Sequence, residues 1–126
     1  MKILLVEDNV TFRKTFKKVL IELFPAMSVE EAGDGVEALA KIQWFTPDLI
    51  FMDIRLPEKN GLELTKMIKQ SHPETAVVLL TDYNLPEYRE AAFASGADDF
   101  VIKGTLNPAA VAALVKSIFQ DRKGAP

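Results

Sequence analysis

The segment IFMDIRLPEKNG, residues 50–61, joins an apolar run to an aspartate, Asp53. Residues 49–52 have the length and the branched and aromatic composition of a buried strand, and Pro57 and Gly61 then mark a loop. A carboxylate at the end of such a strand costs free energy unless a cation or hydrogen-bond donors meet it. The segment therefore predicts a buried strand that carries Asp53 to a site with a compensating charge.

Similar apolar runs recur along the chain, separated by segments with helical spacing of apolar residues. We expect strands at residues 3–6, 27–32, 49–52, 77–80 and 100–102. The strand at 27–32 alternates in polarity, which is typical of a sheet edge with one wetter face. The expected buried helix faces are Phe12, Phe16, Val19, Leu20 and Leu23; Val36, Leu39 and Ala40; Leu64, Met67 and Ile68; Tyr88, Ala91, Ala92 and Ser95; and Val111, Leu114, Val115 and Ile118. Asn107 and Pro108 have the pattern of a helix cap followed by a first-turn proline.

Five strand–helix units in succession predict an α/β fold in which helices cover both faces of a mostly parallel sheet. In such sheets the functional crevice lies at the carboxyl ends of the strands. The length of 126 residues fits one domain, which we expect at residues 1–122, with a tail or linker stub at 123–126.

Composition excludes several classes of function. The formal net charge of −3 argues against direct nucleic-acid binding by this chain. It contains no cysteine, which excludes disulfides and thiolate chemistry. No apolar run approaches the about 20 residues of a membrane helix. We therefore expect a soluble, cytoplasmic protein without a membrane segment.

Polar residues follow four of the five expected strands, and the fold would bring them to one edge of the sheet. These residues are Glu7, Asp8, Asp53, Thr81, Asp82 and Lys103. Clustered carboxylates repel one another, and an oxygen-liganded divalent ion such as Mg²⁺ relieves the repulsion. Together with a lysine and a hydroxyl, they form the set of groups needed to accept a phosphoryl group on a carboxylate.

Four segments resemble motifs of the receiver domain of bacterial two-component response regulators. They are ILLVEDN (residues 3–9), LIFMDIRLPEKNGLEL (49–64), VVLLT (77–81) and GADDFVIK (96–103). The resemblance spans nearly the whole chain and implies a flavodoxin-like (βα)5 three-layer sandwich with parallel strand order 2-1-3-4-5. It also implies a switch that is not a metabolic enzyme and that catalyses only its own phosphorylation and dephosphorylation.

The resemblance further implies roles for individual residues. Asp53 would accept a phosphoryl group from a sensor histidine kinase or a histidine phosphotransfer protein. Mg²⁺ would be held by Asp8, Asp53 and the backbone carbonyl of Arg55, with Glu7 acting through water. Thr81 and Lys103 would contact the phosphoryl group, and Phe100 would be the aromatic switch that moves with Thr81. Homodimers through the fourth helix, fifth strand and fifth helix are common in the family.

The sequence departs from the family pattern at several positions. Asp82 stands where a small residue is usual, Gly104 where proline is most common, and Phe100 where tyrosine is frequent. Arg55 lies where the family tunes self-dephosphorylation. Receivers attached to LuxR-type helix-turn-helix domains often lack the proline too, and residues 104–118 resemble theirs.

Two other functions fit parts of the pattern. A haloacid-dehalogenase-type phosphatase also has a nucleophilic aspartate after a strand, but it carries a second acid where Arg55 stands. A receiver-like binding module that works without phosphate is the other alternative. The basic group Arg13, Lys14, Lys17 and Lys18 is typical of a solvated helix face and could also dock a kinase. His72, in a loop, is expected to lie at the surface.

Overall fold

The computed structural model describes residues 1–124, with side chains through Gln120. Five parallel strands form one sheet in the order β2-β1-β3-β4-β5, which confirms the predicted order. The strands are β1 (Lys2–Val6), β2 (Ser28–Ala32), β3 (Leu49–Asp53), β4 (Ala76–Thr81) and β5 (Asp99–Ile102). The helices are α1 (Val10–Leu23), α2 (Gly35–Phe45), α3 (Gly61–Ser71), α4 (Pro86–Ala94) and α5 (Pro108–Gly124), and a short 3-10 helix covers Lys103–Thr105.

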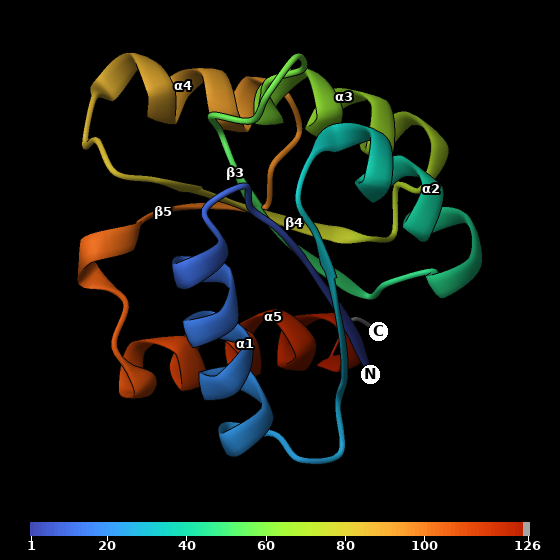
Figure 1. Ribbon diagram of the computed structural model, residues 1–126, viewed down its shortest axis with the longest axis vertical. Coiled ribbons are helices and arrows are strands. Elements are labelled where there is room, and N and C mark those ends of the chain that lie inside the picture. Colours follow the sequence, from blue (N-terminus) through green and yellow to red (C-terminus); the bar gives the residue numbers. More distant parts are fainter. Residues whose placement is uncertain (125–126) are drawn as a thin grey trace.

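The helices form two layers around the sheet, with α2, α3 and α4 on one face and α1 and α5 on the other (Figure 1). Each interface has its own apolar core. Ile42, Leu64 and Ile68 lie in the core under the first layer. Phe16 and Val115 lie in the core under the second. The sheet is thus buried on both sides, as expected for parallel strands.

The position of each strand matches its composition. Every residue of β3 and of β4 is buried, and these strands lie inside the sheet. Strand β2 is at the edge, and only Ala32 of its five residues is buried. Its alternating sequence is therefore explained by one open side. The apolar run that ends at Asp53 is a fully buried strand, as predicted.

Asparagine and aspartate side chains begin four of the helices. Asn9, Asp34, Asn60 and Asn107 each accept a hydrogen bond from a backbone N–H three residues later. Such caps satisfy N–H groups that have no partner inside the helix. The cap at Asn107 confirms the one expected from the sequence. The cap at Asn9 starts α1 immediately after the acidic pair that follows β1, so this loop is short and well defined.

The predicted buried face of α2 is right for Leu39, which packs half-buried against the core, and wrong for Val36 and Ala40, which are exposed. Val36 is 67% exposed. The residues of α2 that are buried are Gly35, Ala38, Ile42 and Phe45. A Cβ atom at Gly35 would lie 2.9 Å from the Leu64 side chain of α3, so the small residues of α2 face inward to allow this close approach. Met67 of α3, also expected inside, is exposed at the rim.

The C-terminal boundary expected at residue 122 falls inside α5, which continues to Gly124. Residues 125 and 126 of the expected tail lie outside the described residues. Among the helices of residues 1–124, none combines the length and apolar content that a membrane span needs.

Candidate functional site

Lys103 connects two acidic side chains that come from different strands. Its Nζ atom forms an ion pair with Glu7, which follows β1, and lies 3.2 Å from Oδ2 of Asp53 at the end of β3. The Lys103 side chain is only 9% exposed. The counter-charge that the sequence required for Asp53 is therefore a lysine from the far end of the chain.

Asp53 is held from two directions. Its Oδ1 atom accepts a hydrogen bond of 3.1 Å from the backbone N–H of Arg55, and Oδ2 accepts the bond from Lys103. The next residue, Ile54, donates its N–H to the carbonyl of Leu80 and extends the pairing with β4. The carboxylate is thus positioned by a rigid strand and two donors, while its neighbour loop lies open to solvent at Arg55.

Three carboxylates form a group at this edge of the sheet. One oxygen each of Glu7, Asp8 and Asp53 lies within 4.8 Å of the others. Glu7 is buried and Asp8 is exposed, so the group reaches from the interior to the surface. An all-oxygen donor set with excess negative charge fits a hard divalent cation such as Mg²⁺ better than zinc, which favours nitrogen and sulfur.

The electrostatics of the group agree with this fit. Burial, together with the neighbouring Asp53, raises the pKa of Glu7 to about 7, and the bonds to Lys103 and to the Asn9 N–H only partly offset that rise. Burial alone would lower the pKa of Lys103, but Glu7 and Asp53 outweigh it and raise that pKa. One lysine thus faces two carboxylates, and a further cation would stabilise the ionised form of both.

The remaining polar residues lie around this centre. Thr81 is buried at the end of β4, one residue beyond Leu80, the register partner of Asp53. Its hydroxyl accepts a hydrogen bond of 3.2 Å from the Tyr83 N–H. Asp82 is exposed. The structure therefore brings Glu7, Asp53 and Lys103 into contact and places Thr81 at the same sheet edge.

The loop after Asp53 folds back closely on the strand. Gly61 donates its N–H to the carbonyl of Ile54 at 2.7 Å. A Cβ atom at this position would lie 2.4 Å from the Asp53 carbonyl oxygen, a distance that real contacts essentially never show. Glycine is therefore required here because the backbone of the loop passes directly against the backbone at the end of β3.

Arg55 and Phe100 lie beside the centre, close to α4. The guanidinium of Arg55 stacks over the Tyr83 ring, 4.5 Å from its centroid, and Nη2 lies 3.4 Å from the Tyr88 hydroxyl. Phe100 is buried in the core beneath α4. Its ring points inward in this structure. The guanidinium carbon of Arg89, on α4, lies 5.9 Å from the centroid of this ring.

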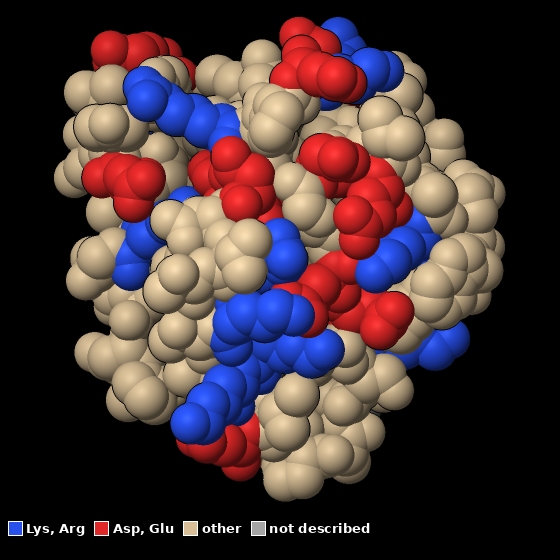
Figure 2. Space-filling view, viewed as in Figure 1, with Lys and Arg blue, Asp and Glu red and all other residues tan. Residues whose placement is uncertain are grey.

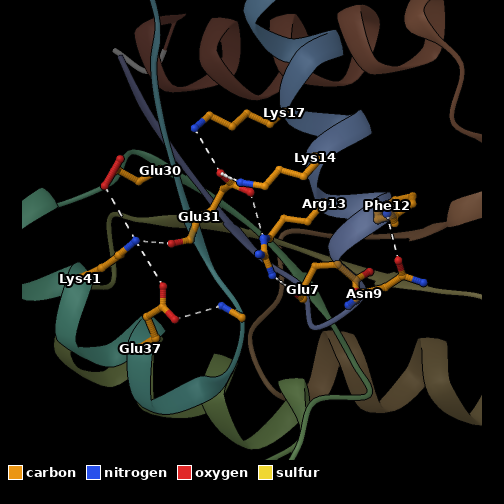
Figure 3. A network of polar contacts seen from close by, with 11 residues as sticks. Glu7, Asn9, Phe12, Arg13, Lys14, Lys17, Glu30, Glu31, Glu37 and Lys41 are labelled. Carbon is orange, nitrogen blue, oxygen red and sulfur yellow. Dashed lines mark hydrogen bonds and ion pairs between the residues drawn. The ribbon is translucent and has the colours of Figure 1, made fainter.

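The basic residues of α1 contact a partner that sequence reasoning missed. Figure 2 shows Lys and Arg side chains gathered over α1, directly beside a group of Asp and Glu side chains. Three of them, Arg13, Lys14 and Lys17, bind the carboxylate of Glu31 on β2 (Figure 3). The solvated-face interpretation is wrong for Arg13, whose side chain is 15% exposed, and no periodicity within α1 could reveal its partner on β2. His72, expected at the surface, is partly buried after α3.

Comparison with known proteins identifies the family to which this chain belongs. Residues 3–117 match the response regulator receiver domain family. The chain is 31% identical over 121 residues to the oxygen regulatory protein NreC of Staphylococcus carnosus, an alignment that covers 95% of this chain and 55% of NreC. The chain spans about half the length of most of the relatives it matches.

Solved structures agree with this match. A LuxR-family two-component response regulator from Aurantimonas superposes with a TM-score of 0.83 at 31% identity, covering 93% of this chain and 83% of that one. A CheY-like receiver domain protein from Methanospirillum hungatei has a TM-score of 0.87 at 28% identity, covering 98% of each chain. The shared fold, the matched residues 3–117 and the identity to LuxR-type regulators lead to one conclusion: this chain belongs to the response regulator receiver domain family of two-component systems.

Proposed function

We propose that this domain is a phosphorylation-dependent signalling switch that accepts a phosphoryl group on Asp53. The donor is the phosphohistidine of a sensor histidine kinase or of a histidine phosphotransfer protein. The observation that supports this most strongly is the arrangement of Asp53 beside both Lys103 and the Glu7–Asp8 pair. A structural ion pair would need only one acid for one lysine, whereas this site keeps three acids together.

The proposed step is an in-line transfer between nitrogen and oxygen. A carboxylate oxygen of Asp53 attacks phosphorus, the new O–P bond forms, and the P–N bond to the donor imidazole breaks with its electron pair going to nitrogen. The product is an acyl phosphate on Asp53. Lys103 lies within 3.2 Å of Oδ2 and would neutralise charge on the transferred oxygens, and the Thr81 hydroxyl would donate to them.

Mg²⁺ would be held by the carboxylates of Asp8 and Asp53 and by the Arg55 carbonyl, with Glu7 acting through water. When bound, Mg²⁺ would neutralise oxygens of the phosphoryl group as charge develops on them. Within the protein, Glu7 and Asp53 share a single cation, Lys103. A second cation would balance the remaining negative charge of these two buried carboxylates. We propose that the reaction takes place in the cytoplasm, the location typical of the receiver domain family.

The proposal treats the domain as a regulator rather than a metabolic enzyme. A haloacid-dehalogenase-type phosphatase would need a general acid two residues after the nucleophile. Arg55 occupies that position, and its side chain stacks on Tyr83 instead of supplying a proton. No acid–base side chain is therefore positioned there to assist the hydrolysis of a phosphate ester by water. We do not expect turnover of small phosphate esters.

Phosphorylation would act on partners through the region around α4. A phosphoryl group adds charge and acceptor oxygens at the sheet edge, and movement of Thr81 would be transmitted to Phe100 beneath α4. Tyr83, Leu85 and Phe93 are exposed on this side and offer apolar surface for a partner or a second copy through α4, β5 and α5. Because the similar proteins include a LuxR-family response regulator, the partner would be an output domain of the kind found in that family.

The experiment that tests the proposal is intact mass spectrometry after incubation with acetyl phosphate and Mg²⁺. We expect one added phosphoryl group, lost in Asp53→Asn and in EDTA, and retained in the control Glu74→Gln, which changes an exposed acid before the start of β4. Absence of the adduct in the wild type, with no amide NMR shifts on addition of beryllofluoride and Mg²⁺, would favour the phosphate-independent binding module.

A further inference from the structure

We propose that Arg13 is the positioning residue of the acidic pair: its guanidinium holds the peptide unit that joins Glu7 to Asp8 and so aims both carboxylates at the cation site. This inference rests on the proposed function, because it assigns Arg13 to the Mg²⁺-binding step of that function. The other basic residues of α1, Lys14 and Lys17, matter here only because they also bind Glu31, the partner of Arg13.

Arg13 makes two contacts that point in different directions. Nη1 donates to the Glu7 carbonyl oxygen at 2.7 Å, and Nε donates to Glu31 Oε1 at 2.9 Å (Figure 3). A guanidinium presents its donors in a rigid plane, so the bond to Glu31 fixes the direction of the bond to Glu7. Gly33 leaves room for this arrangement, since a Cβ atom there would lie 3.3 Å from Nη1.

The position of the Glu7 carbonyl affects the orientation of both acidic residues. It belongs to the same planar peptide unit as the Asp8 N–H, so fixing the oxygen also orients the start of Asp8. On the other side of Glu7, its N–H donates to the Ala32 carbonyl at 3.0 Å. The backbone of Glu7 is thus tied to β2 twice, directly through Ala32 and indirectly through Arg13 and Glu31.

The anchor of Arg13 is itself well fixed. The Glu31 side chain is 13% exposed and carries bonds from Arg13, Lys14 and Lys17. Burial alone would raise the pKa of Glu31, but these cations outweigh it and lower the pKa to about 2. Glu31 is therefore charged at neutral pH, and one ion pair to it can be lost without losing the others.

Positioning and simple electrostatics predict opposite results for removal of Arg13. The guanidinium is a positive charge next to a cation site, so charge alone means that its removal strengthens Mg²⁺ binding. Positioning means that its removal weakens binding, because outer-shell partners that orient ligands are typically worth about 10–100-fold in metal affinity. The sign of the change in affinity thus separates the two explanations.

The test compares Arg13→Met with Lys14→Met by Mg²⁺ titration calorimetry and by ¹⁵N relaxation of the Asp8 amide in metal-free protein. Both variants remove one cation from Glu31, but Lys14 has no contact with Glu7. For Arg13→Met we expect Mg²⁺ affinity about 10-fold weaker and an Asp8 order parameter that falls from about 0.85 to below about 0.6. For Lys14→Met we expect less than about a two-fold change in affinity and an unchanged order parameter.

Three results would overturn the proposal: tighter or unchanged Mg²⁺ binding in Arg13→Met, equal loss in Lys14→Met, or an Asp8 amide as rigid as in the wild type. Arg13→Lys, which keeps the charge without the planar fork, should behave as Arg13→Met does in both measurements. It also carries the test if Arg13→Met does not fold, and wild-type affinity and order parameter in Arg13→Lys would show that the planar guanidinium is not needed and would contradict the proposal.

Failure of the proposed function is a separate outcome. It would be seen in the wild type alone, as absence of Mg²⁺ binding and of the phosphoryl adduct. The relaxation measurement needs neither metal nor phosphate, so it still decides whether Arg13 holds the Glu7–Asp8 peptide unit in that case.

Discussion

Lys103 and Glu7 form an ion pair between residues 96 positions apart in the chain, and the same Nζ atom reaches Asp53. Replacing Lys103 by methionine would leave two buried carboxylates without a cation. Removing one partner of a buried ion pair typically costs about 3–5 kcal/mol. We expect a loss of this size in the free energy of unfolding of Lys103→Met at pH 8 in EDTA, measured by urea denaturation.

The loss should be smaller at pH 5. Burial raises the pKa of Glu7 to about 7, so at pH 5 that side chain is already protonated in the wild type and needs less compensation. Lys17→Met serves as a control, because its partner Glu31 keeps two other cations. Equal losses at both pH values would mean that Lys103 stabilises the fold by packing rather than by charge.

Gly61→Ala should destabilise the protein strongly, whereas Gly104→Ala should not. A methyl group at 61 would meet the Asp53 and Ile54 backbones, so strand or loop must move. Overpacking of this kind costs about 1–3 kcal/mol. At Gly104 nothing lies within 4 Å of an added Cβ, and the expected change is within about 0.5 kcal/mol. Urea unfolding curves compare the two, and wild-type stability of Gly61→Ala would refute the close approach.

Glu31 should contribute stability that depends on pH in the acid range. Its pKa in the folded protein, about 2, is lower than its ordinary value of 4.5. The contribution is therefore fully present above about pH 4.5 and is lost as the pH falls toward 2. Glu31→Gln should lower the free energy of unfolding by about 1–3 kcal/mol at pH 7, and the difference from the wild type should shrink below pH 4.5. Glu30→Gln, at a residue 3.9 Å from Lys41, is the matched control; a difference for Glu31→Gln that stays constant down to pH 2 would contradict the assignment.

The orientation of α2 can be tested by two substitutions. Val36→Gln should change the free energy of unfolding by less than about 0.5 kcal/mol, since surface substitutions rarely do more. Ile42→Ala should cost about 2–5 kcal/mol, because Ile42 is buried in the core under this helix. Thermal unfolding of both variants checks this. A large cost at Val36 would restore the helix face expected from the sequence.

Much of the architecture could be predicted from sequence, because it depends on local patterns. The apolar run before Asp53 and the alternation in residues 27–32 mark a central and an edge strand by composition alone. The strand-end residues converge because parallel strands share one carboxyl edge. Only the receiver resemblance, however, could assign the strand order in advance.

The features missed by sequence analysis depend on contacts between distant segments. The inward face of α2 is decided by Leu64 of α3, which lets Gly35 approach and turns Val36 outward. The partner of Arg13 is decided by the pairing of β1 with β2, which brings Glu31 next to α1. Neither contact leaves a periodic signal within its own segment, so three-dimensional coordinates are needed to see it.

The long separation of Glu7 and Lys103 also bears on how the protein is made. During synthesis the acids after β1 and β3 emerge well before the lysine that follows β5. A chain interrupted before residue 103 would hold Asp53 without the lysine that balances its charge. Incomplete chains thus lack the Lys103 side of the site, and under the proposed function a newly made molecule would respond to phosphorylation only after its last strand has joined the sheet.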